Sequence, residues 1–303
     1  MMNDTQGHKT VLLEETVQAL DPKPGEIYVD ATLGGAGHTR AILLREPRCK
    51  VIGLDWDKSV IDTTGAALAA EFPERFFPVY GNFAKITELV ARAGFTKVHG
   101  IIADFGTSQI QIRNTPGFSV HVDSYLDMRF SPGMFYRTAY DVVNRFKEDD
   151  LADIFFNLGG ESRGRKIARA IIQARSKKKI ETTFQLVKII EDITPGSYHK
   201  IHPATKAFQA LRIYVNQELE NIESFLQNSM KVLHDGGRLV CISFHSLEDR
   251  IVKHFFRDND IKKTESKIGF QMITKKACMA SEQELDQNRS ARSARLRAGI
   301  LRI

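Results

Sequence analysis

The first third of this 303-residue chain alternates between two hydrophobic patterns. Short apolar runs rich in β-branched and aromatic residues, typical of buried strands, occupy residues 26–31, 50–55, 76–80 and 98–104. Between these runs, apolar residues recur every three or four positions over residues 39–44, 59–70 and 83–93, as in amphipathic helices. This alternation predicts a parallel sheet with crossover helices.

The alternation stops near residue 109. A segment rich in Gly, Pro, Ser and aromatic residues leads into helical patterns at residues 149–157, 164–175 and 183–192. Residues 204–234 predict one or two more helices, which end at Asp235-Gly236-Gly237, and residues 238–244 predict another buried strand. Residues 270–274 are a weaker strand candidate, and we expect residues 287–297 to be solvated.

These elements predict an α/β fold, a doubly wound sheet that is interrupted by an inserted helical domain. Residues 1–110 are expected to hold the first part of the sheet domain, with strands one to four. Residues 111–204 form the expected insert. Residues 205–303 bring the chain back to the sheet and end in a basic tail.

Composition limits the class of protein. With 42% hydrophobic and 26% charged residues, the chain is expected to fold around a core. No apolar run approaches the roughly 18 residues that span a bilayer, and residues 1–9 resemble neither a secretory signal nor an organelle presequence. Cys49, Cys241 and Cys278 are far apart and form no Cys-x-x-Cys pair, so we expect reduced thiols, no zinc site and a cytoplasmic location.

Positive charge is concentrated in two segments. Residues 261–303 contain 10 Lys and Arg against 4 Asp and Glu, a surplus equal to the net charge of +6 of the whole chain. Residues 161–180 contain eight Lys and Arg and one acid. In this second segment Lys166, Arg169, Gln173 and Lys177 share one helical face, which either grips phosphates or is merely solvated. The two segments favour a polyanionic partner such as nucleic acid.

The segment from Ile27 to His38 is an apolar run that ends on Asp30, followed by the glycine cluster Gly34-Gly35-Ala36-Gly37. It is typical of a parallel strand that leads into a ligand-binding turn. The dinucleotide fingerprint G-x-G-x-x-G fails, because Arg40 occupies its last glycine position. An acid before a glycine turn suits S-adenosylmethionine instead, with Asp30 holding its ammonium group. An ordinary capped β–α turn is the alternative.

Later strand ends supply further candidates. Asp55, at the end of the second strand, either accepts both hydroxyls of an adenosine ribose or is an ordinary exposed Asp at a strand end. Phe83 follows the third strand as either an adenine-stacking or a core aromatic. Asp104 ends the fourth strand, where we expect the reactive end of the cofactor. Its carboxylate can accept hydrogen bonds from the N–H groups of an exocyclic base amine and align that amine with a methyl donor. Asp104 is therefore the catalytic candidate.

Two other patterns predict little chemistry. The segment from Ser243 to Arg250 contains Ser, His and Asp, but the glycines of a nucleophile elbow do not surround it. The pair His199 and His202 lacks further ligands, so we expect no metal.

Longer motifs run through most of the chain. They are His8-Lys9-Thr10-Val11-Leu12-Leu13-Glu14-Glu15, Asp30-Ala31-Thr32-Leu33-Gly34-Gly35-Ala36-Gly37-His38, Gly117-Phe118-Ser119, Leu126-Asp127-Met128-Arg129, Ile167-Ala168-Arg169-Ala170-Ile171, residues 202–213, Val215-Asn216-Gln217-Glu218-Leu219, residues 244–250 and residues 289–297. On these motifs the chain resembles the MraW/RsmH family, methyltransferases that modify cytosine N4 in bacterial small-subunit (16S) ribosomal RNA.

The resemblance implies a class I (Rossmann-like) methyltransferase domain with a helical insert. It also implies S-adenosylmethionine contacts, at Ala36, Gly37, His38, Asp55, Phe83, Asp104 and Gln111. Of these, Asp55, Phe83 and Asp104 also follow from the strand ends, which add Asp30. The implied substrate is a cytidine at the decoding centre of the assembled small ribosomal subunit, which would explain the basic insert and tail.

The chain departs from the family pattern at three places. Ala36 stands where the family usually has Gly, and its β-carbon would crowd the cofactor if this position needs a positive φ. Ser108-Gln109 replaces a double Ser, and Thr115-Pro116 replaces Glu-Arg. Two other functions stay open at this point, a non-catalytic RNA-binding or ribosome-assembly factor and a Rossmann oxidoreductase. The oligomeric state, a homodimer included, also stays open.

Overall fold

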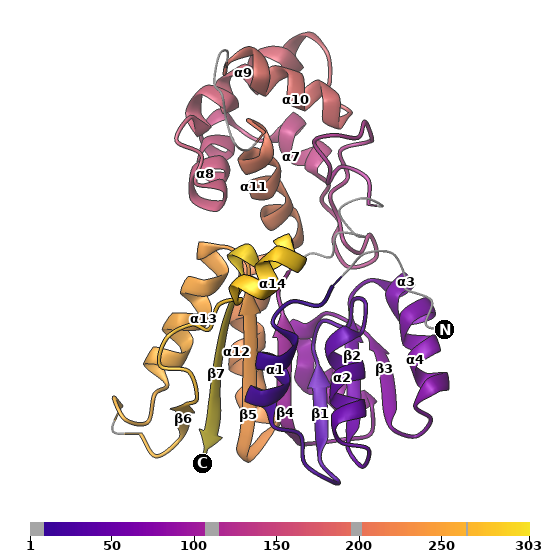
Figure 1. The fold of residues 1–303 in the computed structure, drawn as a ribbon. Helices are drawn as coiled ribbons and strands as arrows, with labels where there is room; N and C mark the ends of the chain where they lie inside the picture. Colours follow the sequence, from indigo (N-terminus) through magenta and orange to yellow (C-terminus); the bar gives the residue numbers. More distant parts are fainter. Residues whose placement is uncertain (1–8, 107–114, 195–201, 265) are drawn as a thin grey trace. The chain divides into compact units, whose positions relative to one another are not determined.

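The computed structural model describes residues 9–106, 115–194, 202–264 and 266–303. Its contacts divide the chain into two compact units, shown in Figure 1. Unit 1 comprises Met1–Ser108 and Leu219–Ile303, and unit 2 comprises Gln109–Glu218.

Unit 1 is built on a sheet that has seven strands within the described residues, in the order β3-β2-β1-β4-β5-β7-β6. The strands are β1 (Ile27–Asp30), β2 (Lys50–Asp55), β3 (Phe76–Tyr80), β4 (Val98–Asp104), β5 (Leu233–Ser243), β6 (Gly269–Met272) and β7 (Arg295–Arg302). Strands β1 to β5 pair in parallel, whereas β7 runs antiparallel to both β5 and β6. The predicted doubly wound α/β fold is confirmed.

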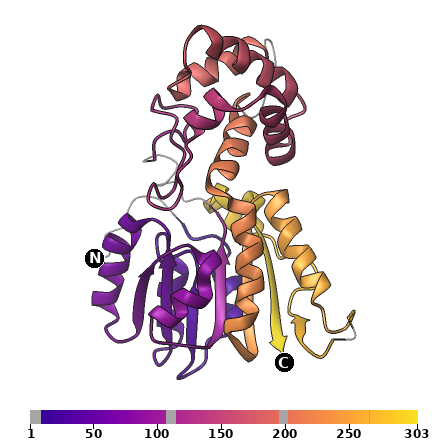
Figure 2. The ribbon, with the colours of Figure 1, turned by 180° about the vertical axis from the view of Figure 1, so that it is seen from behind.

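Helices cover both faces of this sheet. One face packs against α5 (Ile86–Arg92), α12 (Glu218–Val232) and α13 (Ser246–Asp258). The other packs against α1 (Leu13–Leu20), α2 (Gly37–Arg45), α4 (Ala66–Glu71), α14 (Glu282–Gln287) and η3 (Arg289–Ser293). Alternate strand residues serve the two cores: Val29 belongs to the first, and its neighbour Tyr28 to the second. Figure 1 shows α1 and α2 in front of the sheet, and Figure 2 shows the orange α12 on the opposite face.

The first four predicted strands lie where the sequence placed them. The predicted helix over 59–70 is a continuous helical segment, α3 (Lys58–Val60), a π-helical turn η1 (Ile61–Gly65) and α4. The fifth strand begins at Leu233, earlier than predicted, because an irregularity in its pairing with β4 carries it through the glycines at 236 and 237. The short η2 (Phe83–Lys85) precedes α5.

The expectation that residues 287–297 are solvated is wrong. This segment ends α14, forms η3 and enters β7, and Ala291, Ala294 and Leu296 are fully buried in the second core. At the start of β7, Arg295 and Arg297 alternate with Leu296 and Ala298, which are buried in the second core. Further along the strand, Leu301 is buried in the first core.

The described part of unit 2 has no helix over residues 115–138 and is mainly helical from residue 139 onward. Its helices are α7 (Ala139–Arg145), α8 (Glu148–Gly159), α9 (Gly164–Lys177), α10 (Thr183–Asp192) and α11 (Thr205–Asn216). Reciprocal capping boxes begin two of them, Thr138 with Asp141 at α7 and Thr182 with Gln185 at α10. The three helices predicted from 149 to 192 match α8, α9 and α10.

The boundary at the end of the insert differs from the predicted residue 204. Helix α11 belongs to unit 2, where it packs directly on α8. A β-carbon at Gly159 would lie 2.5 Å from the carbonyl oxygen of Lys206, so only glycine permits this close approach. Among the described residues, no helix is both long and apolar enough to cross a membrane.

Candidate functional site

Three predicted carboxylates end adjacent strands of the sheet. Asp30 ends β1, Asp55 ends β2 and Asp104 ends β4, and β1 lies between the other two. In the register, Asp30 pairs with Gly53 and with Ile102, so Asp55 and Asp104 each project two residues further along the strand direction. Two residues correspond to about 7 Å of strand. Asp30 therefore lies deeper than the other two carboxylates.

Asp30 braces the turn that follows β1. Its side chain is 1% exposed. One oxygen accepts from the Thr39 hydroxyl at 2.7 Å and the other from the Thr32 amide at 3.2 Å. Burial raises the pKa of Asp30 to about 6, against the opposing effect of these hydrogen bonds. The carboxylate thus ties the end of β1 to α2, and its expected contact with an ammonium group stays a prediction.

The glycine turn, residues 33–37, is also tied to both neighbouring strands. The Gly34 amide donates to Asp55 at 2.9 Å, and the Leu33 amide donates to the Leu54 carbonyl at 2.8 Å. On the other side, the Asp104 amide donates to the hydroxyl of Thr32 at 2.8 Å. The backbone of the turn is therefore fixed without a ligand, as a preformed binding site requires.

Ala36, which stands where the family usually has Gly, has a left-handed backbone conformation. Its φ is +61°, at the residue before α2, and its side chain is 2% exposed. A non-glycine residue in this region is strained by its β-carbon. The chain therefore carries backbone strain in the predicted cofactor turn.

Glycine serves different purposes at two positions of the turn. A β-carbon on Gly35 would meet no atom within 4 Å, so the space beside this residue is open. At Gly37 the space is filled, since a β-carbon there would lie 1.8 Å from the hydroxyl oxygen of Thr10. Gly37 is required by the packing of the chain's own N-terminal segment.

His38 is anchored by the same segment. Its Nε2 atom lies 3.1 Å from the carbonyl oxygen of Val11, and its side chain is buried. Because a carbonyl oxygen only accepts, Nε2 carries the proton in this contact. The charge of His38 also acts on Asp104. The N-terminal segment contacts Gly37 and His38. Its motif, residues 8–15, was noted in the sequence, but no functional role was predicted for it.

Asp55 accepts two backbone amides, from Gly34 and from Asp57 at 2.8 Å, and is 6% exposed. Burial raises the pKa of Asp55 to about 7, because the two hydrogen bonds only partly offset the loss of solvation and the charges of Asp57 and Asp30 add to it. This carboxylate sits at a strand end with spare acceptor positions, as a ribose-binding group needs.

Phe83 belongs to an aromatic cluster of the first core. Its ring centroid lies 5.3 Å from that of Trp56, 5.6 Å from that of Phe225 and 5.9 Å from that of Phe105. It is 6% exposed, so the core role that the sequence left open is present. Contact with an adenine ring stays a prediction.

Asp104 is half-buried. One of its carboxylate oxygens accepts a hydrogen bond from the Gly106 amide at 3.1 Å. Desolvation raises its pKa to about 6, while His38 opposes the shift and Asp30 and Glu248 add to it. Gly106 packs against Phe244, where a β-carbon would lie 2.5 Å from the ring. The predicted contact Gln111, with Ser108 and Gln109, lies outside the described residues.

The Ser243–Arg250 segment organises the start of α13. The Glu248 carboxylate accepts from the amides of Phe244 and His245 at 2.7 and 3.2 Å, and His245 caps the helix in return. Asp249 pairs with Arg297. These side chains fix the loop after β5 that brings Phe244 beside Gly106.

A model of the MraW methylase family matches residues 5–300. The chain belongs to this family. It is 43% identical to the ribosomal RNA small subunit methyltransferase H of Carboxydothermus hydrogenoformans, over 96% of each chain. It is 45% identical to the enzyme of that name from Deinococcus radiodurans, over 97% of this chain and 90% of the relative. A crystal structure of an rRNA methylase from Streptococcus thermophilus aligns with 97% of this chain and 98% of its own, with a TM-score of 0.45 and 10% identity.

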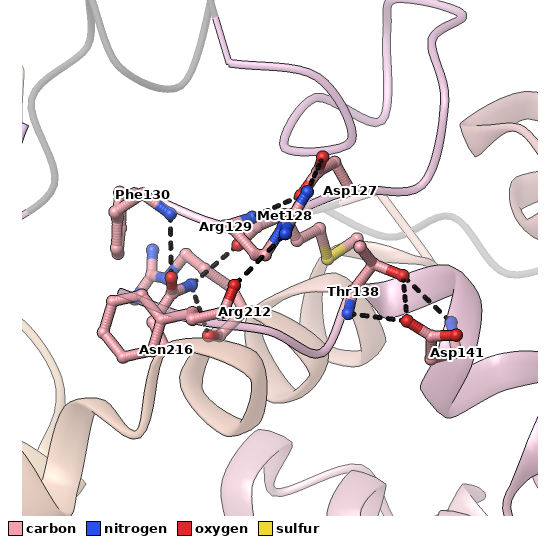
Figure 3. A network of polar contacts seen from close by, with 9 residues as sticks. Asp127, Met128, Arg129, Phe130, Thr138, Asp141, Arg212 and Asn216 are labelled. Atoms are coloured by element: carbon pink, nitrogen blue, oxygen red, sulfur yellow. Dashed lines mark hydrogen bonds and ion pairs between the residues drawn. The ribbon is translucent and has the colours of Figure 1, made fainter. Parts of the chain in front are cut away.

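Two of the motifs in unit 2, Leu126-Asp127-Met128-Arg129 and the one that contains Asn216, meet in one polar network, shown in Figure 3. The Asn216 side chain accepts from the Phe130 amide at 2.8 Å and donates to the Met128 carbonyl at 2.7 Å. Arg129 forms an ion pair with Asp127, at 2.6 Å between Nε and Oδ1. Met128 has a φ of +61° and is buried. The network holds the loop from 126 to 130 against the end of α11.

The basic helix α9 presents an exposed charged face in unit 2. Lys166, Arg169 and Lys177 are exposed as the sequence predicts. Arg169 lies 3.3 Å from Glu148 on α8, so the acidic segment before the basic one offsets part of its charge. Arg175 is different, because it donates to the carbonyls of Val143 and Phe146 at the end of α7.

Proposed function

We propose that this chain transfers the methyl group of S-adenosylmethionine to the exocyclic N4 of a cytidine in small-subunit ribosomal RNA. The observation that carries the proposal is the row of carboxylates at Asp55, Asp30 and Asp104 beside an open glycine turn, in a member of the MraW methylase family. A class I methyltransferase sheet with an inserted helical unit supplies this arrangement.

The residues fit this cofactor chemically. The pKa is raised to about 6 at Asp30, to about 7 at Asp55 and to about 6 at Asp104. These three carboxylates favour a ligand with positive charge, because a cation stabilises their ionised forms. S-adenosylmethionine has a sulfonium and an ammonium group, and when bound it supplies an electrophilic methyl group. A pyrophosphate would be repelled at the same place, which disfavours an oxidoreductase.

Each predicted contact then has a role. Asp55 accepts the ribose hydroxyls, and Phe83 lies on the adenine side with Trp56 beside it. The backbone of Ala36 and Gly37 forms one wall, His38 is positioned behind it, and Asp30 stabilises the turn from below. Gln111 completes the set by family resemblance.

Asp104 is the proposed catalytic residue. The exocyclic amine of cytosine is a weak nucleophile, since its lone pair is delocalised into the ring. A carboxylate that accepts hydrogen bonds from its N–H groups holds the lone pair in line with the methyl group, and alignment can lower the barrier by roughly 7–11 kcal/mol. As the bond from nitrogen to the methyl carbon forms, the bond from that carbon to sulfur breaks and leaves a neutral thioether. The amine loses one proton, which the Asp104 carboxylate is placed to accept. The target base leaves its stack to reach this position.

The proposed partner is ribosomal RNA within the assembled small subunit. The exposed face of α9 supplies phosphate contacts that position the RNA without reading its sequence. A protein that acts on ribosomes works in the cytoplasm, which is the proposed location. The molar mass of the purified protein in solution, measured by light scattering, tests whether it forms a homodimer.

The decisive experiment maps small-subunit rRNA by mass spectrometry in a strain lacking this gene and in its parent. Loss of one N4-methylcytidine supports the proposal, and an unchanged map refutes it. Purified protein is then offered assembled small subunits or free rRNA with labelled cofactor. Tight cofactor binding without transfer to either would favour the non-catalytic RNA-binding factor. Binding of NADH in place of S-adenosylmethionine would favour the oxidoreductase.

A further inference from the structure

The N-terminal strap, which we define as residues 9–12, lies against the glycine turn. Thr10 fills the space above Gly37, and the Val11 carbonyl holds the His38 ring. Val11 and Leu12 are buried, at 3% and 0% exposure. The strap therefore fixes two residues of the predicted cofactor site through direct contact.

The strap is held from the other end of the chain. The Leu12 amide donates to Oε1 of Glu284 at 2.8 Å, and the Asn288 side-chain amide donates to the Lys9 carbonyl at 2.9 Å. Lys9 also contacts Gln287 through its ammonium group. All three partners lie on α14 or at its end, more than 270 residues away in the sequence.

Leu12 needs such a restraint. It has a φ of +51°, which is strained for a bulky side chain and persists only where the surroundings enforce it. On one side the Leu12 carbonyl accepts from the Thr16 hydroxyl at 2.6 Å. On the other side Glu284 holds its amide, so the conformation is fixed between α1 and α14.

We infer that Glu284 and Asn288 are positioning residues that hold the N-terminal strap on the glycine turn and so maintain the cofactor-binding conformation of Gly37 and His38. This inference rests on the proposed function, because it takes the turn to be the cofactor site. It assigns α14, which lies within the basic tail of residues 261–303, a role in cofactor affinity.

The chain offers matched variants. Glu284→Ala removes the acceptor of the Leu12 amide, whereas Glu284→Gln keeps an oxygen at Oε1. Asn288→Asp keeps the oxygen that accepts from the Ser290 amide but places an acceptor against the Lys9 carbonyl. Glu282→Ala, at an exposed position of the same helix, is the control.

We expect Glu284→Ala and Asn288→Asp each to raise the Kd for S-adenosylmethionine about tenfold, the effect of losing one partly buried hydrogen bond. The cofactor KM should rise with it, while kcat at saturating cofactor stays near wild type. Glu284→Gln and Glu282→Ala should bind like wild type. Hydrogen exchange should accelerate at the amides of residues 10–12 and 35–38 in the two weakened variants.

Wild-type affinity in both Glu284→Ala and Asn288→Asp would overturn the inference, as would equal weakening by Glu282→Ala. If Glu284→Ala fails to fold, Asn288→Asp decides alone. The proposed function fails separately, if the wild-type protein does not bind S-adenosylmethionine. In that case exchange rates in the free proteins still decide whether α14 holds the turn, and unchanged rates in the glycine turn would refute it.

Discussion

Asp249 at the start of α13 and Arg297 on β7 form a two-pronged ion pair, with Nε and Nη2 of the arginine 2.8 and 3.2 Å from the two carboxylate oxygens. Both side chains are largely buried, at 9% and 13% exposure. Burial alone would raise the pKa of Asp249. The hydrogen bond and the charge of Arg297 outweigh burial and hold this pKa below its ordinary value. A charge expected to face RNA thus joins β7 to a helix.

Arg297→Ala should lower the free energy of unfolding by about 3 kcal/mol, because it leaves the Asp249 carboxylate buried without its main partner. Arg292→Ala, at an exposed position of η3, should change it by less than about 0.5 kcal/mol. Urea denaturation measures both. Equal and small effects would mean that the pair contributes nothing and that the arginine serves another partner.

The error at β7 shows what sequence reasoning missed in this fold. In the strand Arg295–Arg302, arginines at 295 and 297 suggested a solvated tail, yet Leu296 between them and Ala298 after them are buried. The alternation of charged and apolar residues predicts a strand, but the positive charge led us to expect a solvated segment instead. The partner that makes the charges tolerable, Asp249, lies 48 residues away and only the folded chain brings it close.

The strand-end carboxylates were predictable, since parallel strands bring their carboxyl ends to one edge and Asp30, Asp55 and Asp104 each follow an apolar run. The N-terminal strap was not. Its contacts with α14 are set by tertiary packing. Nothing in the sequence indicates that Thr10 packs on the glycine turn or that Glu284 binds the amide of Leu12. The packing of Thr10 against Gly37 could not be predicted either, for the same reason.

Ala36→Gly should stabilise the protein by about 0.5–1 kcal/mol. Relief of the left-handed strain at φ +61° is worth about 1–2 kcal/mol, and the greater freedom of glycine in the unfolded chain returns part of it. The converse exchange, Gly34→Ala at φ +46°, should destabilise by a similar amount. Thermal and urea unfolding compare the two. Loss of stability in Ala36→Gly would show that the packing of the Ala36 methyl outweighs the strain.

Neutralising the exposed face of α9 should weaken RNA binding. If Lys166 and Lys177 contact phosphates, each change to Gln should flatten the salt dependence of RNA affinity by about one slope unit. Arg169→Gln should do less, because Glu148 already offsets its charge. Lys188→Gln on α10, whose lysine pairs with Asp192, is the control. Cofactor affinity should not change. An unaltered slope after all three changes would mean that this face is only solvated.

Cofactor affinity should depend on pH through Asp55. Its pKa in the folded protein is about 7, above the roughly 3.9 of an unfolded chain. The free protein holds this proton more tightly than the unfolded chain does. Its stability therefore falls as the pH rises from about 4 to 7. Cofactor affinity should do the opposite, increasing toward pH 7 and levelling above it, because the ribose hydroxyls need the ionised carboxylate.

Asp55→Asn should lower affinity by roughly 1–3 kcal/mol at pH 8. It should also move the midpoint of the pH dependence from about 7 to about 6, where Asp30 and Asp104 still titrate. Calorimetry between pH 5.5 and 8.5 measures both effects, and the single tryptophan, Trp56, gives an independent fluorescence signal beside the site. Asp62→Asn, at an exposed position, should leave the profile as in wild type. A wild-type profile in Asp55→Asn would remove Asp55 from the ribose site.

Asp104→Asn should abolish most methyl transfer while the fold survives. Asparagine keeps the oxygen that accepts from the Gly106 amide, and the bond to Thr32 uses the backbone amide of residue 104. The second oxygen becomes an N–H donor that faces the N–H of the target amine. With cofactor and ribosomal substrate both saturating, the single-turnover rate should fall about two orders of magnitude, roughly 2.7 kcal/mol. A rate near wild type would limit Asp104 to cofactor binding. The Phe244–His245 segment, or Ser108, would then be the better catalytic candidate.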